Sequence, residues 1–120
     1  MQKSKIKTLL IYQILAKYSD ERHPLNTTEI IEKLAEYDIP CERKSIYADV
    51  KALNAVGYDV CTTYFPKKGF FLGQRQFELP EVRLLIDAVQ SAGFITPGKT
   101  ESLVKKLETL VSVEQARSMV

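Results

Sequence analysis

The residues with the clearest binding chemistry lie between positions 43 and 51. Within nine positions this run places three cations and two hydroxyl side chains: Arg43, Lys44, Ser45, Tyr47 and Lys51. Guanidinium and ammonium groups donate hydrogen bonds to phosphate oxygens and to base edges, and hydroxyls can do the same. Two further pairs complete the candidate set. Lys67 and Lys68 follow a proline, and Thr27 and Thr28 follow Asn26.

These side chains bind a nucleic acid only if the surrounding elements expose them on one surface. The spacing predicts a helix over about 42–56. With ~100° per residue, Val50 and Leu53 fall on the same side as Ile46. Lys44, Ala48, Lys51 and Ala55 fall on the opposite side. Asp49 lies on the flank nearer the core, so we expect it to pair with a cation from a neighbouring helix. The alternative is that the cationic side is an ordinary solvated helix face.

Two earlier helices and one hairpin complete the predicted module. Ser4–Tyr18 has apolar residues at helical spacing, namely Ile6, Leu9, Leu10, Ile14 and Leu15. A second helix follows Asn26, an N-cap paired with Glu29 in a capping box, and runs to about Tyr37. Gly57 ends the third helix.

After Gly57 the apolar period changes from helix to strand. Residues 60–65 and 70–77 are the two expected strands, and Pro66–Gly69 is the turn between them. Lys67 and Lys68 therefore lie at a basic hairpin tip, although lysines are also common at turns with no such role. The expected fold class is mainly α with a small β-hairpin: a winged helix-turn-helix of three helices plus wing, followed by a C-terminal helical arm.

The tail is predicted to be helical and different in character. Residues 1–77 form the expected DNA-binding domain, and residues 78–120 a linker or dimerisation arm. One helix is expected near Glu81–Gln90, followed by a long final helix that begins after Thr96 as N-cap. Its apolar stripe is formed by Leu103, Val104, Leu107, Leu110 and Val111. The stripe either joins two copies of the chain or folds back on the preceding helix.

Composition narrows the class of protein. The chain has 120 residues and a formal net charge of +2. This length and charge are typical of one soluble domain, with or without a short appendage. Cys41, Cys61 and His23 are too few and too widely spaced for a zinc site. We therefore expect buried or half-buried thiols in a reducing compartment, a cytoplasmic protein without a membrane span, no cofactor, no metal and no enzymatic activity.

The third helix also resembles a known family. Arg43-Lys44-Ser45-Ile46-Tyr47-Ala48-Asp49-Val50-Lys51-Ala52-Leu53 is similar to the recognition helix of bacterial transcriptional regulators that carry a C-terminal WYL domain. Gly69-Phe70-Phe71-Leu72, Phe77-Glu78-Leu79-Pro80-Glu81 and Ser91-Ala92-Gly93-Phe94-Ile95-Thr96 match later stretches of that family. Winged helices of the DeoR and biotin-repressor type share only the first part.

The resemblance implies sequence-specific transcriptional regulation on double-stranded DNA. The third helix is expected in the major groove, with the tip at 66–69 on the backbone or in the minor groove. A homodimer is the expected assembly. The family's effector domain is absent from this sequence, which is read as a shortened piece or a stand-alone derivative. The alternative function is a winged helix used as a protein–protein interaction module.

Overall fold

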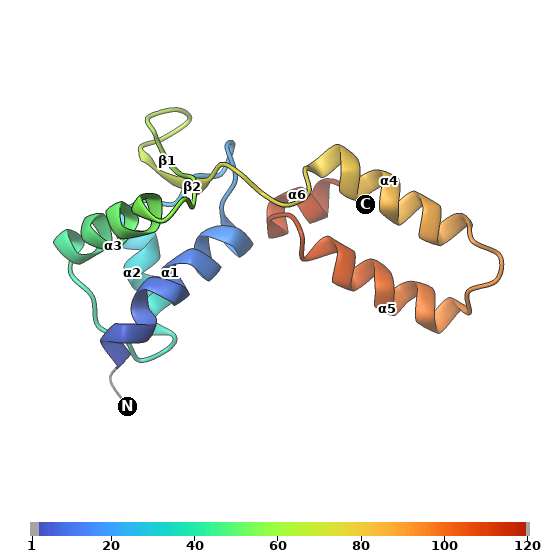
Figure 1. Ribbon diagram of the computed structural model, residues 1–120, viewed down its shortest axis with the longest axis horizontal. Coiled ribbons are helices and arrows are strands. Elements are labelled where there is room, and N and C mark those ends of the chain that lie inside the picture. Colours follow the sequence, from blue (N-terminus) through green and yellow to red (C-terminus); the bar gives the residue numbers. More distant parts are fainter. Residues whose placement is uncertain (1–2, 120) are drawn as a thin grey trace. The chain divides into compact units, whose positions relative to one another are not determined.

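The computed structural model describes residues 3–119, with side chains from Ile6 to Met119. This part of the chain is mainly helical and contains one small antiparallel sheet of two strands. The elements in chain order are α1 (Lys3–Tyr18), α2 (Thr27–Ala35), α3 (Arg43–Ala55), β1 (Val60–Thr63), β2 (Gly69–Leu72), α4 (Leu79–Ser91), α5 (Pro97–Glu108) and α6 (Val113–Ser118) (Figure 1). They form two compact units, Met1–Gln74 and Arg75–Val120, each with its own apolar core.

One core holds the first three helices and the hairpin together. Five of its side chains have no exposed surface: Ile11, Leu15, Ile30, Leu34 and Ile46. Each such side chain stabilises the fold by about 1.5–3 kcal/mol relative to an exposed position. From α3 the buried residues are Ile46, Val50 and Leu53, which confirms the predicted inward face and its helical register.

The buried face of α1 differs from the prediction at one position. Leu9 was expected inside, but its side chain is 55% exposed, whereas Ile11 is fully buried. The two residues are about 200° apart around the helix, so both cannot face the core. The inward face instead includes the buried Lys7, a charged residue that an apolar pattern does not select.

Local signals explain where α2 and α3 begin and end. The Asn26 side chain accepts a hydrogen bond from the Glu29 N–H at 2.8 Å, and the Glu29 carboxylate accepts one from the Asn26 N–H at 3.0 Å. This is the predicted capping box. Helix α2 ends at Ala35, two residues before the expected end. Gly57 has φ +100° just beyond α3, a conformation that glycine adopts without steric cost.

Both strands of the hairpin end earlier than predicted, β1 at Thr63 and β2 at Leu72. Val60 pairs with Leu72 and Thr63 with Gly69, so β2 ends five residues before Phe77. Strand pairing stops at Leu72 because its partner, Val60, is the first residue of β1. Beyond Val60, only the Asp59 carbonyl continues the contact, accepting a hydrogen bond from the Gly73 N–H at 2.7 Å.

The second unit is a helical hairpin with a core of Val82, Ile86 and Val111. Helix α5 lies beside α4 (Figure 1) and begins after the predicted N-cap Thr96, whose hydroxyl accepts a hydrogen bond from the Lys99 N–H. The prediction of a single long final helix is wrong. Helix α5 ends at Glu108, and a separate helix, α6, begins after Ser112.

The cause of this break is a second capping box. The Ser112 hydroxyl accepts a hydrogen bond from the Gln115 N–H at 3.1 Å, and the Gln115 side chain accepts one from the Ser112 N–H at 3.2 Å. The intervening turn buries Val111 to 2% exposure. No helix within residues 3–119 is long and apolar enough to cross a membrane.

Candidate nucleic-acid interface

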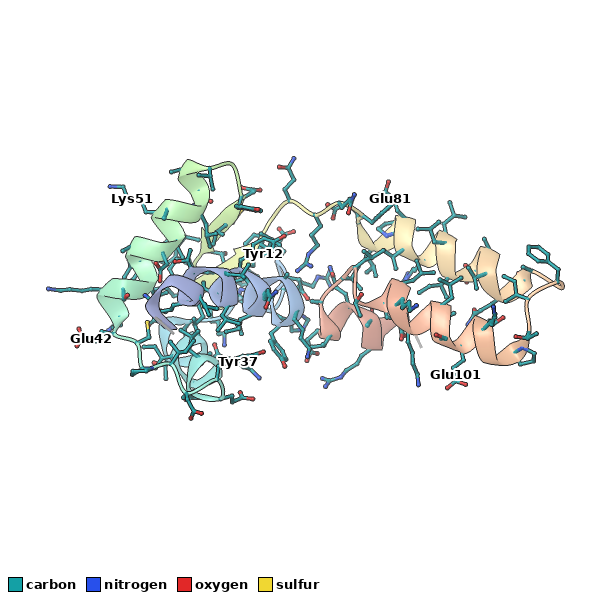
Figure 2. The ribbon with its side chains drawn as sticks, turned by 60° about the horizontal axis from the view of Figure 1, so that its bottom comes forward. Tyr12, Tyr37, Glu42, Lys51, Glu81 and Glu101 are labelled. Atoms are coloured by element: carbon teal, nitrogen blue, oxygen red, sulfur yellow. The ribbon has the colours of Figure 1, made fainter. Side chains whose placement is uncertain are left out.

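Helix α3 carries three exposed cations: Lys44 and Lys51 on its outward face, and Arg43 at its first position. Arg43, Lys44 and Lys51 are exposed, and none of them has an ion-pair partner among the residues that the structure describes. Lys51 extends away from the helix into solvent (Figure 2). Ala48 and Ala55 are exposed between and beside them. The face is therefore positive, and the positions between and beside its lysines carry only small alanine side chains. We call these three residues the cationic face.

The acidic residue of α3 is removed from that face by an ion pair. Asp49 accepts a hydrogen bond from Lys7 Nζ at 2.5 Å and one from Thr8 Oγ1 at 2.8 Å. Both partners belong to α1, which confirms the prediction that Asp49 pairs with a cation of a neighbouring helix. Lys7 also donates to the Ser45 hydroxyl. Ser45 is thus turned toward α1 and away from the exposed cations.

Two sets of polar contacts fix the hairpin relative to the helices. The Asn54 side chain of α3 donates to the Val60 carbonyl at 3.0 Å and accepts from the Val60 N–H at 2.8 Å. On the other side of the hairpin, Leu25 and Phe70 exchange two backbone hydrogen bonds. The hairpin is therefore held to α3 through β1 and to the start of α2 through β2.

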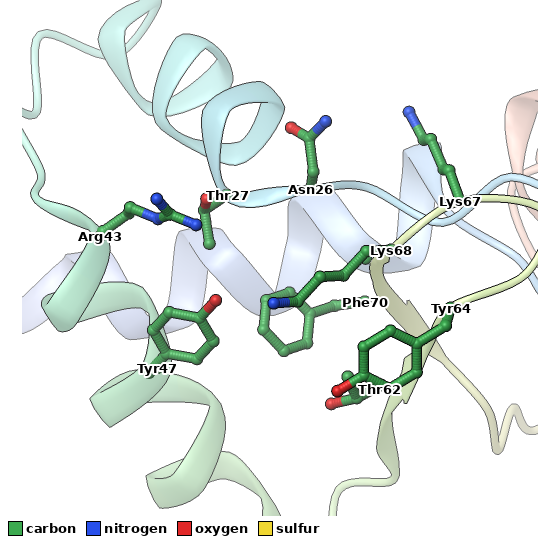
Figure 3. A pocket seen from close by; sticks show the side chains of 10 residues that line it. Asn26, Thr27, Arg43, Tyr47, Thr62, Tyr64, Lys67, Lys68 and Phe70 are labelled. Carbon is green, nitrogen blue, oxygen red and sulfur yellow. The ribbon is translucent and has the colours of Figure 1, made fainter.

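A pocket of about 380 Å³ opens where the start of α2, α3 and the hairpin meet. We call it the junction pocket. Its lining contains three cations and no carboxylate, and consists of Asn26, Thr27, Arg43, Tyr47, Thr62, Tyr64, Lys67, Lys68, Gly69 and Phe70. Figure 3 shows the Lys68 side chain reaching across Phe70 toward Tyr47, and the Arg43 side chain lying beside Thr27. The ring of Tyr47 packs edge-on against Phe70, with 5.7 Å between ring centroids.

The two lysines of the hairpin tip differ in their surroundings. Lys67 Nζ contacts the Glu29 carboxylate at 2.6 Å, and its side chain points away from the pocket centre (Figure 3). Lys68 Nζ lies 5.8 Å from the centroid of the Tyr64 ring. Partial burial raises the pKa of Glu29. The hydrogen bonds from Lys67 and the Asn26 backbone, with the charges of Lys67 and Lys33, outweigh this effect and hold the pKa below its usual value.

The structure brings together most of the residues singled out from the sequence. Five line the junction pocket, namely Thr27, Arg43, Tyr47, Lys67 and Lys68. Lys44 and Lys51 lie on the outer face of α3, Thr28 is exposed at the start of α2, and Ser45 faces α1.

Sequence reasoning missed Asn26, Thr62 and Tyr64 as pocket residues. Asn26 was recognised only as a helix cap. The alternation of residues 60–65, which places Thr62 and Tyr64 on one face, was visible in the sequence, but it did not indicate which face meets α3.

The remaining reactive side chains lie outside this pocket. Burial raises the pKa of the Cys61 thiol, and the nearby Asp59 carboxylate, 3.5 Å away, raises it further. A thiol with a raised pKa is a weak nucleophile at neutral pH. His23 Nδ1 lies 2.8 Å from the Asp20 carboxylate in the loop after α1. Among the residues described, no group of three or more His, Cys, Asp or Glu could hold a metal ion.

Comparison with known proteins adds no relative to this picture. No family model, no curated protein and no solved structure matches the chain.

Proposed function

We propose that this chain binds double-stranded DNA in a sequence-specific manner, as the DNA-binding part of a transcriptional regulator. In this proposal residues 1–74 form a winged helix-turn-helix, with α3 as the recognition helix and the hairpin as the wing. The observation that supports it best is the cationic face. Three neighbouring cations without an internal counter-charge are suited to an external polyanion.

The shape of α3 suits a major groove. The groove is about 12 Å wide and admits one helix. Ala48 and Ala55 keep the exposed face narrow, and Asp49 is held by Lys7 where it does not repel phosphate. The bonds from Asn54 to Val60 keep the hairpin beside α3, so that both elements can contact one duplex.

The resemblance to WYL-domain regulators agrees with these positions. In the similar stretch, Ile46, Val50 and Leu53 lie inside, whereas Lys44 and Lys51 lie outside. This division of roles is the one that a recognition helix requires. Regulation of transcription, a cytoplasmic location and a homodimer on a two-fold operator remain parts of the proposal.

Selection from a random duplex pool tests the proposal. The intact chain is expected to enrich a defined sequence, and Lys44→Ala or Lys51→Ala is expected to weaken binding to it by ~1–3 kcal/mol, measured by fluorescence anisotropy. Lys105→Ala on α5 is the matched control, because Lys105 is exposed outside the proposed interface. Failure to enrich any sequence, or an equal loss in all three variants, contradicts the proposal.

A second candidate function is docking to another protein through the hairpin. It is favoured by the exposed aromatic residues Tyr64 and Phe65, which are 74% and 84% exposed. Exposed apolar side chains that lie together are a feature of protein interfaces. Under this function Phe65→Ala abolishes binding to the partner, the cations of α3 are dispensable, and the duplex pool yields no enriched sequence.

A further inference from the structure

The charged side chains that line the junction pocket are all cationic. Its charged residues are Arg43, Lys67 and Lys68, and no carboxylate lines it. Glu29 already neutralises Lys67 from outside the pocket. Arg43 and Lys68 have no ion-pair partner among the residues that the structure describes. Two uncompensated cations from different elements therefore face one cavity.

The wall formed by α2 adds hydrogen-bond donors. Thr27 is only 7% exposed and lines the pocket. Its hydroxyl makes no hydrogen bond with any residue that the structure describes. Because no fully buried side-chain oxygen in this part of the chain lacks a partner, the hydroxyl keeps solvent access. The backbone N–H groups of Thr27 and Thr28 likewise have no acceptor in this part of the chain, because the Asn26 side chain caps only Glu29. Free N–H groups at the start of a helix favour a bound phosphate.

We propose that the junction pocket holds one phosphate of the DNA backbone between Arg43 and Lys68, with the Thr27 hydroxyl as a third donor. This inference rests on the proposed function and makes it more specific. Although Arg43 is the first residue of the recognition helix, its side chain lies beside Thr27 (Figure 3). In this arrangement Arg43 contacts the DNA backbone instead of a base edge. The phosphate then fixes the register of α3 in the groove, and Lys44 and Lys51 read the sequence.

A scan of single neutral phosphates tests this arrangement. Duplexes of the selected sequence are made with one methylphosphonate at each position in turn and titrated with the intact chain. One position in each half-site is expected to weaken wild-type binding about tenfold. The same substitution is expected to have a smaller effect on Arg43→Ala or Lys68→Ala, in which one of the two cations is already missing. Both variants keep the wild-type base preference. Each flattens the slope of log K against log salt by up to about 0.9, the value for one lost phosphate contact.

Lys44→Ala is the matched control because Lys44 adjoins Arg43 but does not line the pocket. It is expected to remain sensitive to the same methylphosphonate and to lose base preference. If Arg43→Ala instead loses preference at one base pair and the methylphosphonate effect remains in full, Arg43 contacts a base and the inference is overturned.

Inorganic phosphate separates this inference from the proposed function. Amide NMR shifts of Thr27 and Thr28 are followed in a phosphate titration at constant ionic strength. If no duplex sequence is enriched, the proposed function fails. Saturable phosphate binding that Arg43→Ala abolishes would then assign the pocket to a small phosphorylated ligand and overturn DNA as its source. The absence of both duplex and phosphate binding would show that the junction pocket is not a phosphate-binding site.

Discussion

Leu25 and Phe70 exchange two backbone hydrogen bonds, each 2.8 Å long, although 44 residues of sequence separate them. The pairing gives β2 a neighbour on each side, with β1 on one edge and Leu25 on the other. Leu25 immediately precedes Asn26, the N-cap of α2. One residue pair therefore fixes the distance between the start of α2 and the hairpin, and with it the width of the junction pocket.

This close approach requires a residue without a side chain at position 69. A Cβ atom on Gly69 would lie 2.8 Å from the carbonyl carbon and oxygen of Leu25, which are backbone atoms that cannot rotate away. We expect Gly69→Ala to destabilise the fold by about 1–3 kcal/mol and to lower DNA affinity by displacing the hairpin. Thermal unfolding measures the first effect. Gly98→Ala is the control, since its Cβ would meet nothing within 4 Å. Equal melting temperatures for the two variants would contradict the described approach of β2 to Leu25.

Leu53 tests the register of α3. Its side chain is 6% exposed within the core of the first unit. Truncation to alanine is expected to cost ~2–5 kcal/mol in the free energy of unfolding, measured in urea, because it removes buried methyl groups and leaves a cavity. The neighbouring Ala52 is exposed, and Ala52→Ser serves as a control with little expected effect. A loss below 1 kcal/mol for Leu53→Ala would show that this side of α3 does not face the core.

The parts of the fold that follow from short-range patterns could be predicted from the sequence. The inward face of α3 follows from apolar spacing, and the start of α2 from the reciprocal bonds of Asn26 and Glu29. The hairpin position follows from the change of period after Gly57. Each of these signals lies within a few residues of the element that it defines.

The features that could not be predicted depend on contacts between residues that are distant in the sequence. Lys7 is buried because it meets Asp49, and no local pattern reveals this pairing. The buried face of α1 contains Lys7, whereas Leu9 is 55% exposed. Lys67 and Lys68 are equivalent in the sequence, yet only Lys67 meets Glu29. The pocket could not be predicted for the same reason, because its walls come from three separate segments.

Glu29 is expected to limit the affinity of the hairpin for DNA. It has two roles, since its carboxylate both completes the capping box and pairs with Lys67. Glu29→Gln keeps the cap, which glutamine can also form, and removes the charge that holds Lys67. The variant is expected to bind all duplex sequences more tightly, with a salt slope steeper by about 0.9 as Lys67 gains a phosphate contact. Glu32→Gln removes an exposed charge from the same helix and controls for net charge. The same salt slope in both variants would show that Lys67 does not gain a phosphate contact in Glu29→Gln.

The same ion pair predicts a pH dependence. The pKa of Glu29 lies below its usual value of 4.5 because of its bonds to Lys67 and Asn26. A carboxyl whose pKa is depressed by folding stabilises the fold above its unfolded pKa, and this contribution is lost as pH falls through the folded value. Carboxyl NMR titration should therefore show Glu29 protonating below pH 4.5, and Lys67→Met should raise its pKa. An unchanged pKa in Lys67→Met would show that the ion pair does not form in solution.

Assembly depends on the second unit, where the expected apolar stripe is largely used within one chain. Val104, Leu107 and Leu110 pack against the core of Val82, Ile86 and Val111. The alternative in which the last segment folds back on the preceding helix therefore describes this unit. The apolar surface that remains is elsewhere: Leu84 of α4 is 70% exposed, and Phe94 in the loop before α5 is 90% exposed.

We therefore expect a homodimer, if formed by residues 78–120, to use the outer side of α4 instead of the stripe. A single helix-turn-helix reads few base pairs, and paired modules on half-sites ~34–36 Å apart are the usual solution. Sedimentation equilibrium at micromolar concentration should give a dimer for the intact chain and a monomer for residues 1–77. Leu84→Glu should dissociate the dimer, because it places a charge in an apolar contact. Gln90→Glu adds the same charge at another exposed position of α4 and should leave it intact. A monomeric intact chain, or a dimeric 1–77 fragment, would exclude the second unit as the dimerisation element.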